Sequence, residues 1–416
     1  MQRQIITDIG CLANVRTKTH ILRGKELAEL PCIENAYLVI NNGLIEDYGS
    51  MQTIPEKYSD TANYKLQTAN GATVLPCWCD SHTHLVFAAS REEEFVDKIK
   101  GISYAEIAAK GGGILNSARK LNNTAEEVLY NQAFIRLKEL IQLGTGAIEI
   151  KSGYGLTVEG ELKMLRVIKQ LKENSAIPIK ATFLGAHAFP AAYRNNHKGY
   201  IDLIINEMLP QIAAENLADY IDVFCEEGFF SPEETETICR AGMQYGLKPK
   251  IHANQLHLSG GTQVGVKLGA ISVDHLETMD EDAVTQLVNS KTIGTLLPTA
   301  AYFLSMPFQP ARQLIDAGCA IALASDFNPG SSPSGNMNTV ISISCIQMKM
   351  LPEEAINAAT INGAYAMELG EETGSITPGK RANLIFTKPI SSLAYLPYAF
   401  GSNMIDKVMI NGTFID

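Results

Sequence analysis

Residues 74–84 read Val74-Leu75-Pro76-Cys77-Trp78-Cys79-Asp80-Ser81-His82-Thr83-His84, an apolar run that ends in two histidines. Residues 74–79 have the length and composition of a buried β-strand. Beyond them, His82 and His84 point to the same side of an extended backbone because side chains alternate with a period of two. Two imidazoles on one side are half of a metal site, although each is also acceptable as a hydrogen-bonded polar group at a strand end.

Seven more short apolar runs follow, and amphipathic stretches of helical period separate them. The eight runs are residues 74–79, 147–151, 179–185, 221–224, 250–253, 271–274, 294–297 and 320–324, and helices are expected at 124–143, 158–173, 200–216, 232–245 and 311–317. This alternation is typical of βα units around a parallel sheet. Eight units over about 250 residues predict an α/β fold, a (β/α)8 TIM-like barrel within residues 74–374. An open, doubly wound sheet is the alternative arrangement of the same units.

Both ends of the chain are rich in short strands that are broken by turns. Residues 36–40 and 44–48 flank Asn41-Asn42-Gly43, a hairpin signal, and residues 383–387 and 408–410 precede Asn411-Gly412. We expect residues 1–73 and 375–416 to form one small composite β-sandwich domain, which would bring the two termini together.

The composition excludes several classes of partner. The chain has 416 residues, 46% hydrophobic and 19% charged, and 34 Lys and Arg against 45 Asp and Glu leave a net charge of −11. A negative chain disfavours nucleic acid and anionic membranes as partners. The N-terminal residues lack the apolar core of a secretory signal, and no apolar run reaches the roughly 18 residues of a membrane span, so we expect a cytoplasmic protein. The eight cysteines form no C-x-x-C pair and are expected to be buried thiols.

Polar residues gather where the predicted strands end. Five of the eight histidines, at positions 82, 84, 187, 252 and 275, lie at or just after the end of a predicted strand, and Asp326 follows the eighth strand. In a βα barrel the carboxyl ends of the strands carry the reactive groups. Any one of these histidines alone is an ordinary polar residue, but together they indicate a metal-dependent active site.

The order of these residues resembles the amidohydrolase superfamily: H-x-H after the first strand, one histidine after each of the fifth and sixth, and aspartate after the eighth. Four blocks, DSHTHLVF at 80–87, EIKSGYGL at 149–156, TFLGAHA at 182–188 and DFNPG at 326–330, resemble particular members of it. Those members hydrolyse the ring amide of 4-imidazolone-5-propionate to N-formimidoyl-L-glutamate during the degradation of histidine to glutamate. The resemblance implies the same hydrolysis of a cyclic-amide C–N bond here.

The resemblance also implies a metal and a set of catalytic residues. It assigns one Zn²⁺ or Fe³⁺ per subunit to His82, His84, His252 and Asp326, with a position open for water. It places His275 beside the water or the attacked oxygen, and it lets Asp326 carry the proton to the departing nitrogen.

Gln255 stands where many members of the superfamily have glutamate. An amide cannot accept a proton at neutral pH, so Gln255 would hydrogen-bond the substrate ring, and the general base would be His275 or Asp326. Lys151 and Lys180 lie near strand ends, where relatives with two metals have a bridging lysine. Salt bridges or surface positions are the simpler interpretation of both lysines.

A substrate with a propionate tail requires a cation. Arg91 is placed to supply it, unless it pairs with one of the glutamates at 92–94. The resemblance adds contacts to the tail, to the ring and to the opened product from Tyr104, Tyr154, His187, Asn328, Gly330 and Ser331. The long connection at residues 85–123 includes Lys110-Gly111-Gly112-Gly113 and is interpreted either as a lid or as a surface excursion.

Two other functions stay open from the sequence. Another cyclic-amide hydrolase or an aminohydrolase (a deaminase) would share the metal ligands but not an arginine for a carboxylate. A non-enzymatic scaffold of the same fold is disfavoured because all four ligands are present. The expected partner is a small anionic substrate, and the resemblance suggests a homodimer.

Overall fold

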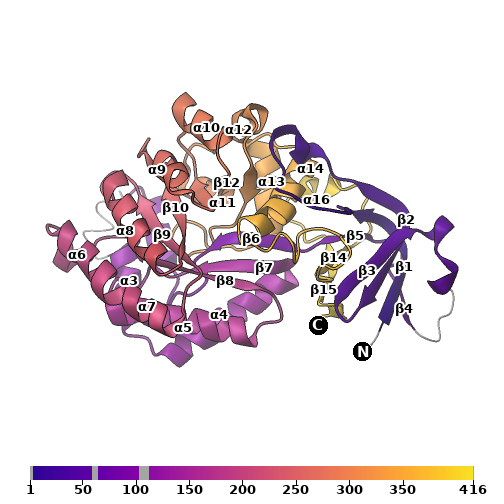
Figure 1. Cartoon of the computed structure of the whole chain (residues 1–416), viewed down its shortest axis with the longest axis horizontal. Coiled ribbons are helices and arrows are strands. Elements are labelled where there is room, and N and C mark those ends of the chain that lie inside the picture. Colours follow the sequence, from indigo (N-terminus) through magenta and orange to yellow (C-terminus); the bar gives the residue numbers. More distant parts are fainter. Residues whose placement is uncertain (1–2, 59–63, 103–111, 416) are drawn as a thin grey trace.

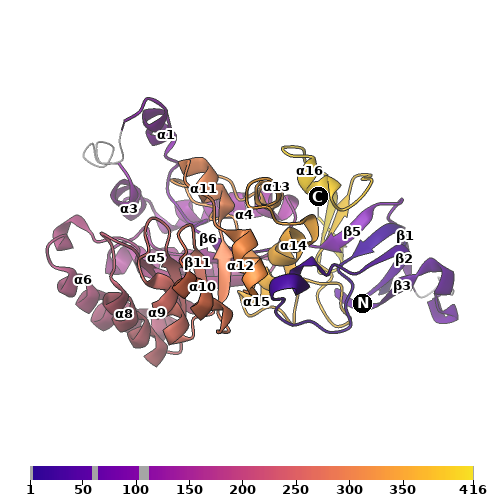
Figure 2. The same cartoon turned by 90° about the horizontal axis from the view of Figure 1, so that it is seen from above.

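Two eight-stranded sheets organise the chain in this computed structural model, which describes residues 3–58, 64–102 and 112–415. One sheet is the barrel, and the other lies at its side and contains strands from both chain ends (Figure 1). Figures 1 and 2 mark both chain ends at this second sheet. Within the described residues, no helix has the length and apolar character that crossing a membrane requires.

The barrel strands run parallel and pair in sequence order. They are β6 (Trp78–Thr83), β7 (Thr145–Lys151), β8 (Ile179–Ala186), β9 (Tyr220–Cys225), β10 (Lys248–Ala253), β11 (Ser272–His275), β12 (Ile293–Leu296) and β13 (Ile321–Leu323). An unbroken order of eight confirms the barrel and excludes the doubly wound sheet, in which the strand order reverses. The barrel is closed between β6 and the residues that follow β13. There His84 N–H donates to Phe327 O at 2.8 Å, and Asp326 N–H donates to His82 O at 3.0 Å.

The run at 74–79, predicted as one strand, is divided between the two sheets. β5 (Thr73–Pro76) pairs with β1 (Arg3–Ala13) and β14 (Leu384–Thr387), and β6 begins only at Trp78. At the crossing, Cys77 N–H donates to Asn383 O and Trp78 N–H donates to Gly144 O, both at 2.9 Å. The backbone therefore changes its pairing partner within one apolar run, and no local pattern marks the change.

The end sheet confirms that the two ends combine. Its other strands are β2 (Cys32–Asn41), β3 (Leu44–Ser50), β4 (Lys65–Thr68), β15 (Ile405–Ile410) and β16 (Thr413–Phe414), in the order β16-β15-β14-β5-β1-β2-β3, with β4 beside β1. The predicted hairpin joins β2 to β3, and Asn42 and Gly43 have positive φ there (52° and 80°). Ile6 and Leu38 belong to the apolar cluster on one face, and Ile5 and Val39 to the cluster on the other, so both faces are covered.

Helices cover the outside of the barrel. They are α1 (Glu92–Ile99), α3 (Ile114–Asn122), α4 (Glu126–Gln142), α5 (Val158–Asn174), α6 (His197–Leu203), α7 (Leu209–Glu215), α8 (Pro232–Gln244), α9 (Gly261–Leu268), α10 (Glu281–Val288), α11 (Pro298–Leu304), α12 (Ala311–Ala317), α13 (Met337–Gln347), α14 (Pro352–Asn357), α15 (Gly363–Tyr365) and α16 (Tyr395–Tyr398). Single turns occur at η1 (Gly24–Ala28), η2 (Met51–Thr53), η3 (Glu56–Tyr58), η5 (Ala191–Tyr193), η6 (Ile204–Met208) and η7 (Ala358–Asn362). α4, α5, α8 and α12 match their predictions closely.

Two predictions need correction, and a third is refined. The helix expected at 200–216 is present from His197 to Glu215, and it contains the π-helical turn η6, which precedes Pro210, a residue without an N–H to donate. The connection at 85–123 contains α1 and α3, and α1 stands at the rim of the barrel beside α11 (Figure 2). Tyr104, Lys110 and Gly111 lie outside the described residues. Of the eight cysteines, all free, Cys77, Cys79, Cys225, Cys239 and Cys319 are buried, whereas Cys32 is exposed and Cys11 and Cys345 are partly exposed.

Candidate active site

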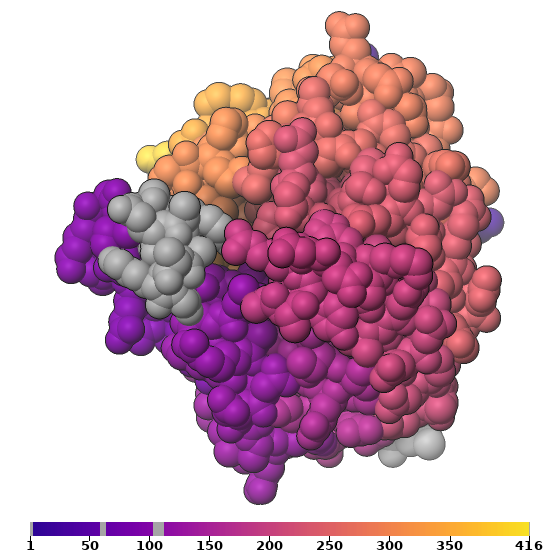
Figure 3. All heavy atoms as spheres, turned by 90° about the vertical axis from the view of Figure 1, so that its left-hand side faces the viewer, coloured from indigo at the N-terminus to yellow at the C-terminus, as the bar shows by residue number. Residues whose placement is uncertain are grey.

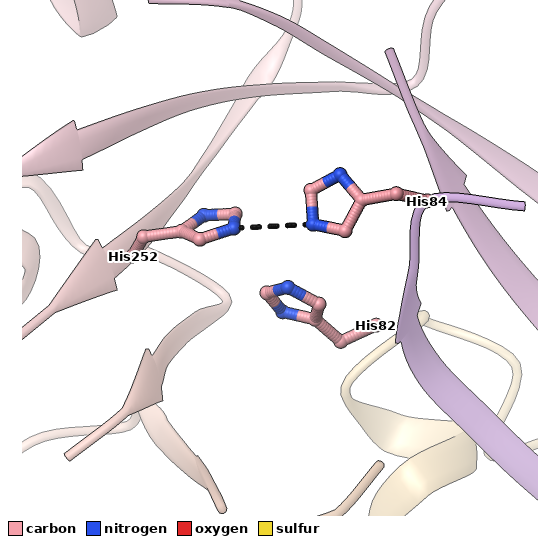
Figure 4. Close-up of side chains that lie close together, drawn as sticks. All are labelled: His82, His84 and His252. Carbon is pink, nitrogen blue, oxygen red and sulfur yellow. Dashed lines mark hydrogen bonds between the residues drawn. The ribbon is translucent and has the colours of Figure 1, made fainter. Parts of the chain in front are cut away.

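Three histidines converge at the carboxyl end of the barrel. His82 and His84 come from the end of β6 and His252 comes from β10, and their rings face one another (Figure 4). The Nε2 atoms of His84 and His252 lie 3.5 Å apart. The Oδ1 atom of Asp326 lies 3.5 Å from Nε2 of both His82 and His84. All four side chains are buried, so the structure brings together the four residues predicted as ligands.

These four donors fit a metal ion. Ligands about 2.1 Å from a tetrahedral centre lie roughly 3.4 Å from each other, close to the separations found here. His82 Nδ1 lies 2.7 Å from Asp274 Oδ2, and His252 Nδ1 lies 2.9 Å from Asp222 Oδ2. Each of these carboxylates accepts the Nδ1 proton, so both Nε2 atoms carry a lone pair. Nε2 of His82 has no hydrogen-bond partner among the described residues. The lone pairs of the ligand atoms repel one another unless a cation lies between them.

Burial keeps the three histidines neutral, which is the form that binds a metal. It lowers the pKa of His82, His84 and His252 well below the ordinary value of 6.5, and nearby positive charge, including Lys151, lowers it further. Neutral imidazoles leave the site without positive charge of its own. A divalent or trivalent cation would therefore meet no repelling charge from these ligands.

A buried ion network lies behind the histidines. Lys151 Nζ lies 2.7 Å from Glu149, 2.8 Å from Asp222 and 3.4 Å from Asp274, and Lys250 also pairs with Glu149. Burial alone would lower the pKa of Lys151, but the three carboxylates raise it above the ordinary value. Lys151 is thus ion-paired, as its salt-bridge interpretation expects. Lys180 lies 3.9 Å from Asp219, partly exposed to solvent.

His275 and Asp326 lie together beside the ligands. A donor atom of His275, one of His82 and one of Asp326 all lie within 4.8 Å of one another. His275 Nδ1 is 3.4 Å from Glu277 Oε1. Burial lowers the pKa of His275, but Glu277, together with Asp326 and Asp274, outweighs burial and leaves this pKa above its ordinary value. Burial raises the pKa of Asp326 to about 6. Both backbones have positive φ, 88° and 53°, a conformation that costs energy outside glycine.

A cavity of about 840 Å³ opens from these residues. Every described residue assigned to substrate or product lines it: Arg91, Tyr154, His187, Gln255, Asn328, Gly330 and Ser331. His187 stacks on His84, with 5.3 Å between ring centroids. Tyr104 lies outside the described residues, so its predicted role is not tested by the geometry.

Arg91 lines this cavity. Its Nε donates to Ser117 Oγ at 2.9 Å, and its Nη2 is buried with no partner among the described residues. No ion pair joins Arg91 to the glutamates at 92–94 in the described part of the chain, so the alternative pairing is not found. A Cβ at position 330 would lie 2.3 Å from Arg91 Nη1, so only glycine leaves room for the guanidinium.

The loop after Asp326 is organised by Asn328. Its Oδ1 accepts the N–H groups of Gly330 and Ser331, both at 2.8 Å, and its Nδ2 donates to Asp326 O at 2.6 Å. Ser331 Oγ donates to Asp326 Oδ2 at 3.2 Å. Asn328 therefore shapes the loop, and Asn328, Gly330 and Ser331 line the cavity.

Two buried glutamates hold the other loops of the site. Glu161 of α5 accepts backbone N–H groups of Gly153, Gly155 and Leu156 at 3.0, 2.7 and 2.9 Å, and thereby fixes Tyr154 between them. Glu226 accepts Leu256 N–H at 2.8 Å, next to Gln255.

The sequence analysis missed Asp222, Asp274, Glu277 and the two glutamates. One signal was available for Asp222 and Asp274, since each is a charged residue inside an apolar strand run. Glu161 has the spacing of an ordinary helix residue, so its loop contacts carried no such signal.

Comparison with known proteins agrees with this geometry. The model of the amidohydrolase family matches residues 73–415. An imidazolonepropionase of Flavobacterium johnsoniae is 61% identical over 412 residues, 99% of each chain, and one of Clostridium tetani is 42% identical over 94% of this chain and 93% of its own.

Solved structures are similar in fold alone. Guanine deaminase of E. coli has a TM-score of 0.76 at 16% identity and covers 100% of this chain and 99% of its own. An adenosine deaminase from Xanthomonas campestris with bound zinc has a TM-score of 0.67 at 15% identity and covers 99% of this chain and 92% of its own.

Proposed function

Because the chain belongs to the amidohydrolase family and, within it, to the imidazolonepropionases, we propose how its own residues carry out the reaction. The reaction is hydrolysis of the ring amide C–N bond of 4-imidazolone-5-propionate, which yields N-formimidoyl-L-glutamate. One observation carries the residue assignment: Arg91 lines the cavity, and its buried Nη2 has no partner among the described residues. The propionate of the substrate supplies that partner.

His82, His84, His252 and Asp326 are the residues that would hold one Zn²⁺ or Fe³⁺ ion. When bound, such an ion supplies Lewis acidity toward the ring carbonyl and makes a water molecule easier to deprotonate at neutral pH. Asp222 and Asp274 orient two of the ligands through their Nδ1 protons. Either metal accepts three imidazoles and one carboxylate.

The proton steps belong to Asp326 and His275. Asp326 accepts a proton from the attacking water as the water oxygen bonds to the ring carbonyl carbon. It returns that proton to the ring nitrogen when the C–N bond breaks and its electron pair passes to the nitrogen. His275 is held at Nδ1 by Glu277, so its Nε2 faces the site and hydrogen-bonds the oxygen of the attacked carbonyl. Gln255 hydrogen-bonds the ring and accepts no proton.

Remote contacts place the ring for attack. Arg91 binds the propionate, and Tyr154 and His187 contact the ring from the loops after β7 and β8. Gly330 and Ser331, set by Asn328, line the cavity beside the carboxylate that the reaction creates. Tyr104 is proposed as a further tail contact on the resemblance alone.

A deaminase is the second candidate, because solved deaminases share the fold. A purine or pyrimidine would leave Arg91 without an anion in a buried setting, which costs free energy. The unpartnered Nη2 of Arg91 therefore favours the ring hydrolase.

The direct test incubates purified protein with freshly generated 4-imidazolone-5-propionate, follows its loss and measures bound zinc and iron. We expect turnover by the wild type, and in His275→Asn a loss of kcat of about 100-fold or more with bound metal retained. Guanine and cytosine serve as control substrates. Ammonia release from either, without loss of the imidazolone, would support the deaminase instead.

A further inference from the structure

Lys98 lies on the same helix face as Arg91. Arg91 is the N-cap of α1, and Phe95 and Lys98 follow it at spacings of four and seven residues, which places all three on one side of the helix. All three line the cavity. Phe95 also stacks on Phe303 of α11, with 5.3 Å between ring centroids, so α1 is held against the cavity rim. In Figure 3 the violet segment that includes α1 stands out from this rim.

Gly330 connects Lys98 to Arg91. Lys98 Nζ donates to Gly330 O at 3.5 Å, and the guanidinium of Arg91 occupies the space where a Cβ of residue 330 would be. The backbone of one residue thus contacts both cations. The next residue, Ser331, contacts Asp326 at the candidate metal site.

Among the described residues, no carboxylate forms an ion pair with Arg91 or Lys98. Glu94, the nearest acid along the helix face, accepts Gly113 N–H at 3.0 Å. The charge of Glu94 raises the pKa of Lys98, but by less than burial and Arg91 lower it. Burial and the charge of Arg91 both lower the pKa of Lys98, which is the effect expected of two like charges placed together. Two partly buried cations without an acid are stabilised by a bound anion.

We propose that Lys98 is a second, specificity-determining contact for the substrate's propionate, beside Arg91. One carboxylate has two oxygens, so the guanidinium of Arg91 can bind one and Lys98 Nζ the other. The inference rests on the proposed function, because the anion is the tail of the imidazolone substrate. The pair of cations also lets the site discriminate between substrates. A cyclic substrate without an anionic tail leaves both cations unpaired and binds poorly.

The test compares Lys98→Met, Lys98→Arg and the control Lys100→Met, which alters an exposed lysine on the same helix. For Lys98→Met we expect KM to rise about tenfold with kcat within about twofold of wild type, because tail binding is remote from the breaking bond. Lys98→Arg restores a cation and should keep KM within about threefold. Lys100→Met should leave both constants unchanged.

A tail-amide analogue of the substrate separates a carboxylate contact from a general effect. On this analogue, KM of wild type and Lys98→Met should agree within about twofold, because the carboxylate that Lys98 binds is missing. An unchanged KM for the true substrate in Lys98→Met, or an equal loss on the amide, would overturn the proposal. Wild-type turnover of the imidazolone in the same assay keeps the proposed function separate from that outcome. Thermal melting of each variant excludes unfolding as the cause.

Discussion

Gly330 shows how one missing side chain can set substrate affinity. The φ angle of Gly330 is not positive, so the backbone conformation would permit other residues. Glycine is required instead because a Cβ would collide with the guanidinium of Arg91. Gly330→Ala should displace the guanidinium and raise KM about tenfold, with bound metal unchanged, because an arginine held in place loses less entropy on binding. Steady-state kinetics and metal analysis check this, with the exposed Ser334→Ala as control. An unchanged KM would mean that the guanidinium has another position from which it binds the tail.

Gln255 lies in the cavity, and its effect on the chemistry can be tested directly. A carboxylate at this position accepts a proton that an amide cannot, so Gln255→Glu should raise kcat severalfold at pH 8 and add an acidic limb to the pH profile. The measurement is kcat from pH 5 to 9. A fall in kcat across that range would show that the amide itself is fitted to the ring.

At the scale of elements, the α5 helix positions the loop after β7 through Glu161. Glu161→Gln leaves one accepting oxygen where two now receive three N–H groups, and its NH₂ would face a backbone donor. We expect stability to fall by about 2 kcal/mol and kcat/KM by about tenfold as Tyr154 loses its position, with bound metal retained. Urea unfolding, kinetics and metal analysis are the readouts, and the exposed Glu159→Gln is the matched control. A variant with wild-type kinetics would show that Tyr154 is held by its other contacts.

The elements also show what the sequence could predict. Residues 320–324 were found as a strand because buried parallel strands are continuously apolar, and the histidines and Asp326 were found because they lie at or just after the ends of predicted strands. The division of 74–79 between two sheets was not predictable, since it depends on Asn383 and Gly144, which are remote in sequence. The same holds for Asp274 and Glu277, whose contacts with His82 and His275 exist only after the barrel closes. The short α1 was missed because its acidic first turn resembles a surface loop.

At the scale of the whole molecule, the buried histidines make the fold sensitive to acid. Burial lowers the pKa of His187 from 6.5 to about 4, and the pKa values of His82, His84 and His252 shift in the same direction. Between these values the unfolded chain binds more protons than the folded chain, so stability falls as pH falls from 6.5 to 4. In metal-free protein, His187→Gln should reduce the slope of the free energy of unfolding against pH by up to about 1.4 kcal/mol per pH unit. Urea midpoints from pH 7.5 to 5 measure it, and an equal slope in both proteins would contradict the assigned shift.

Charge has different effects at long and at short range. The net charge of −11 acts over the whole surface and repels an anionic substrate weakly through salt solution. Arg91 and Lys98 act within the cavity, where screening by salt is weaker. The net charge thus disfavoured nucleic acid as a partner and did not describe the site.

The end sheet has a consequence for the order in which the protein can be made. β5 is complete once residue 76 has been synthesised, but β14, its neighbour in the sheet, begins at residue 384. At about 5–20 residues per second, the ribosome needs roughly 15–60 s to supply the missing strand. During that time one edge of β5, all of whose side chains are buried in the finished fold, has no strand to pair with. The N-terminal strands therefore cannot complete their sheet until the C-terminal strands have been synthesised. During that interval the unpaired edge of β5 is the part of the nascent chain that a chaperone would cover.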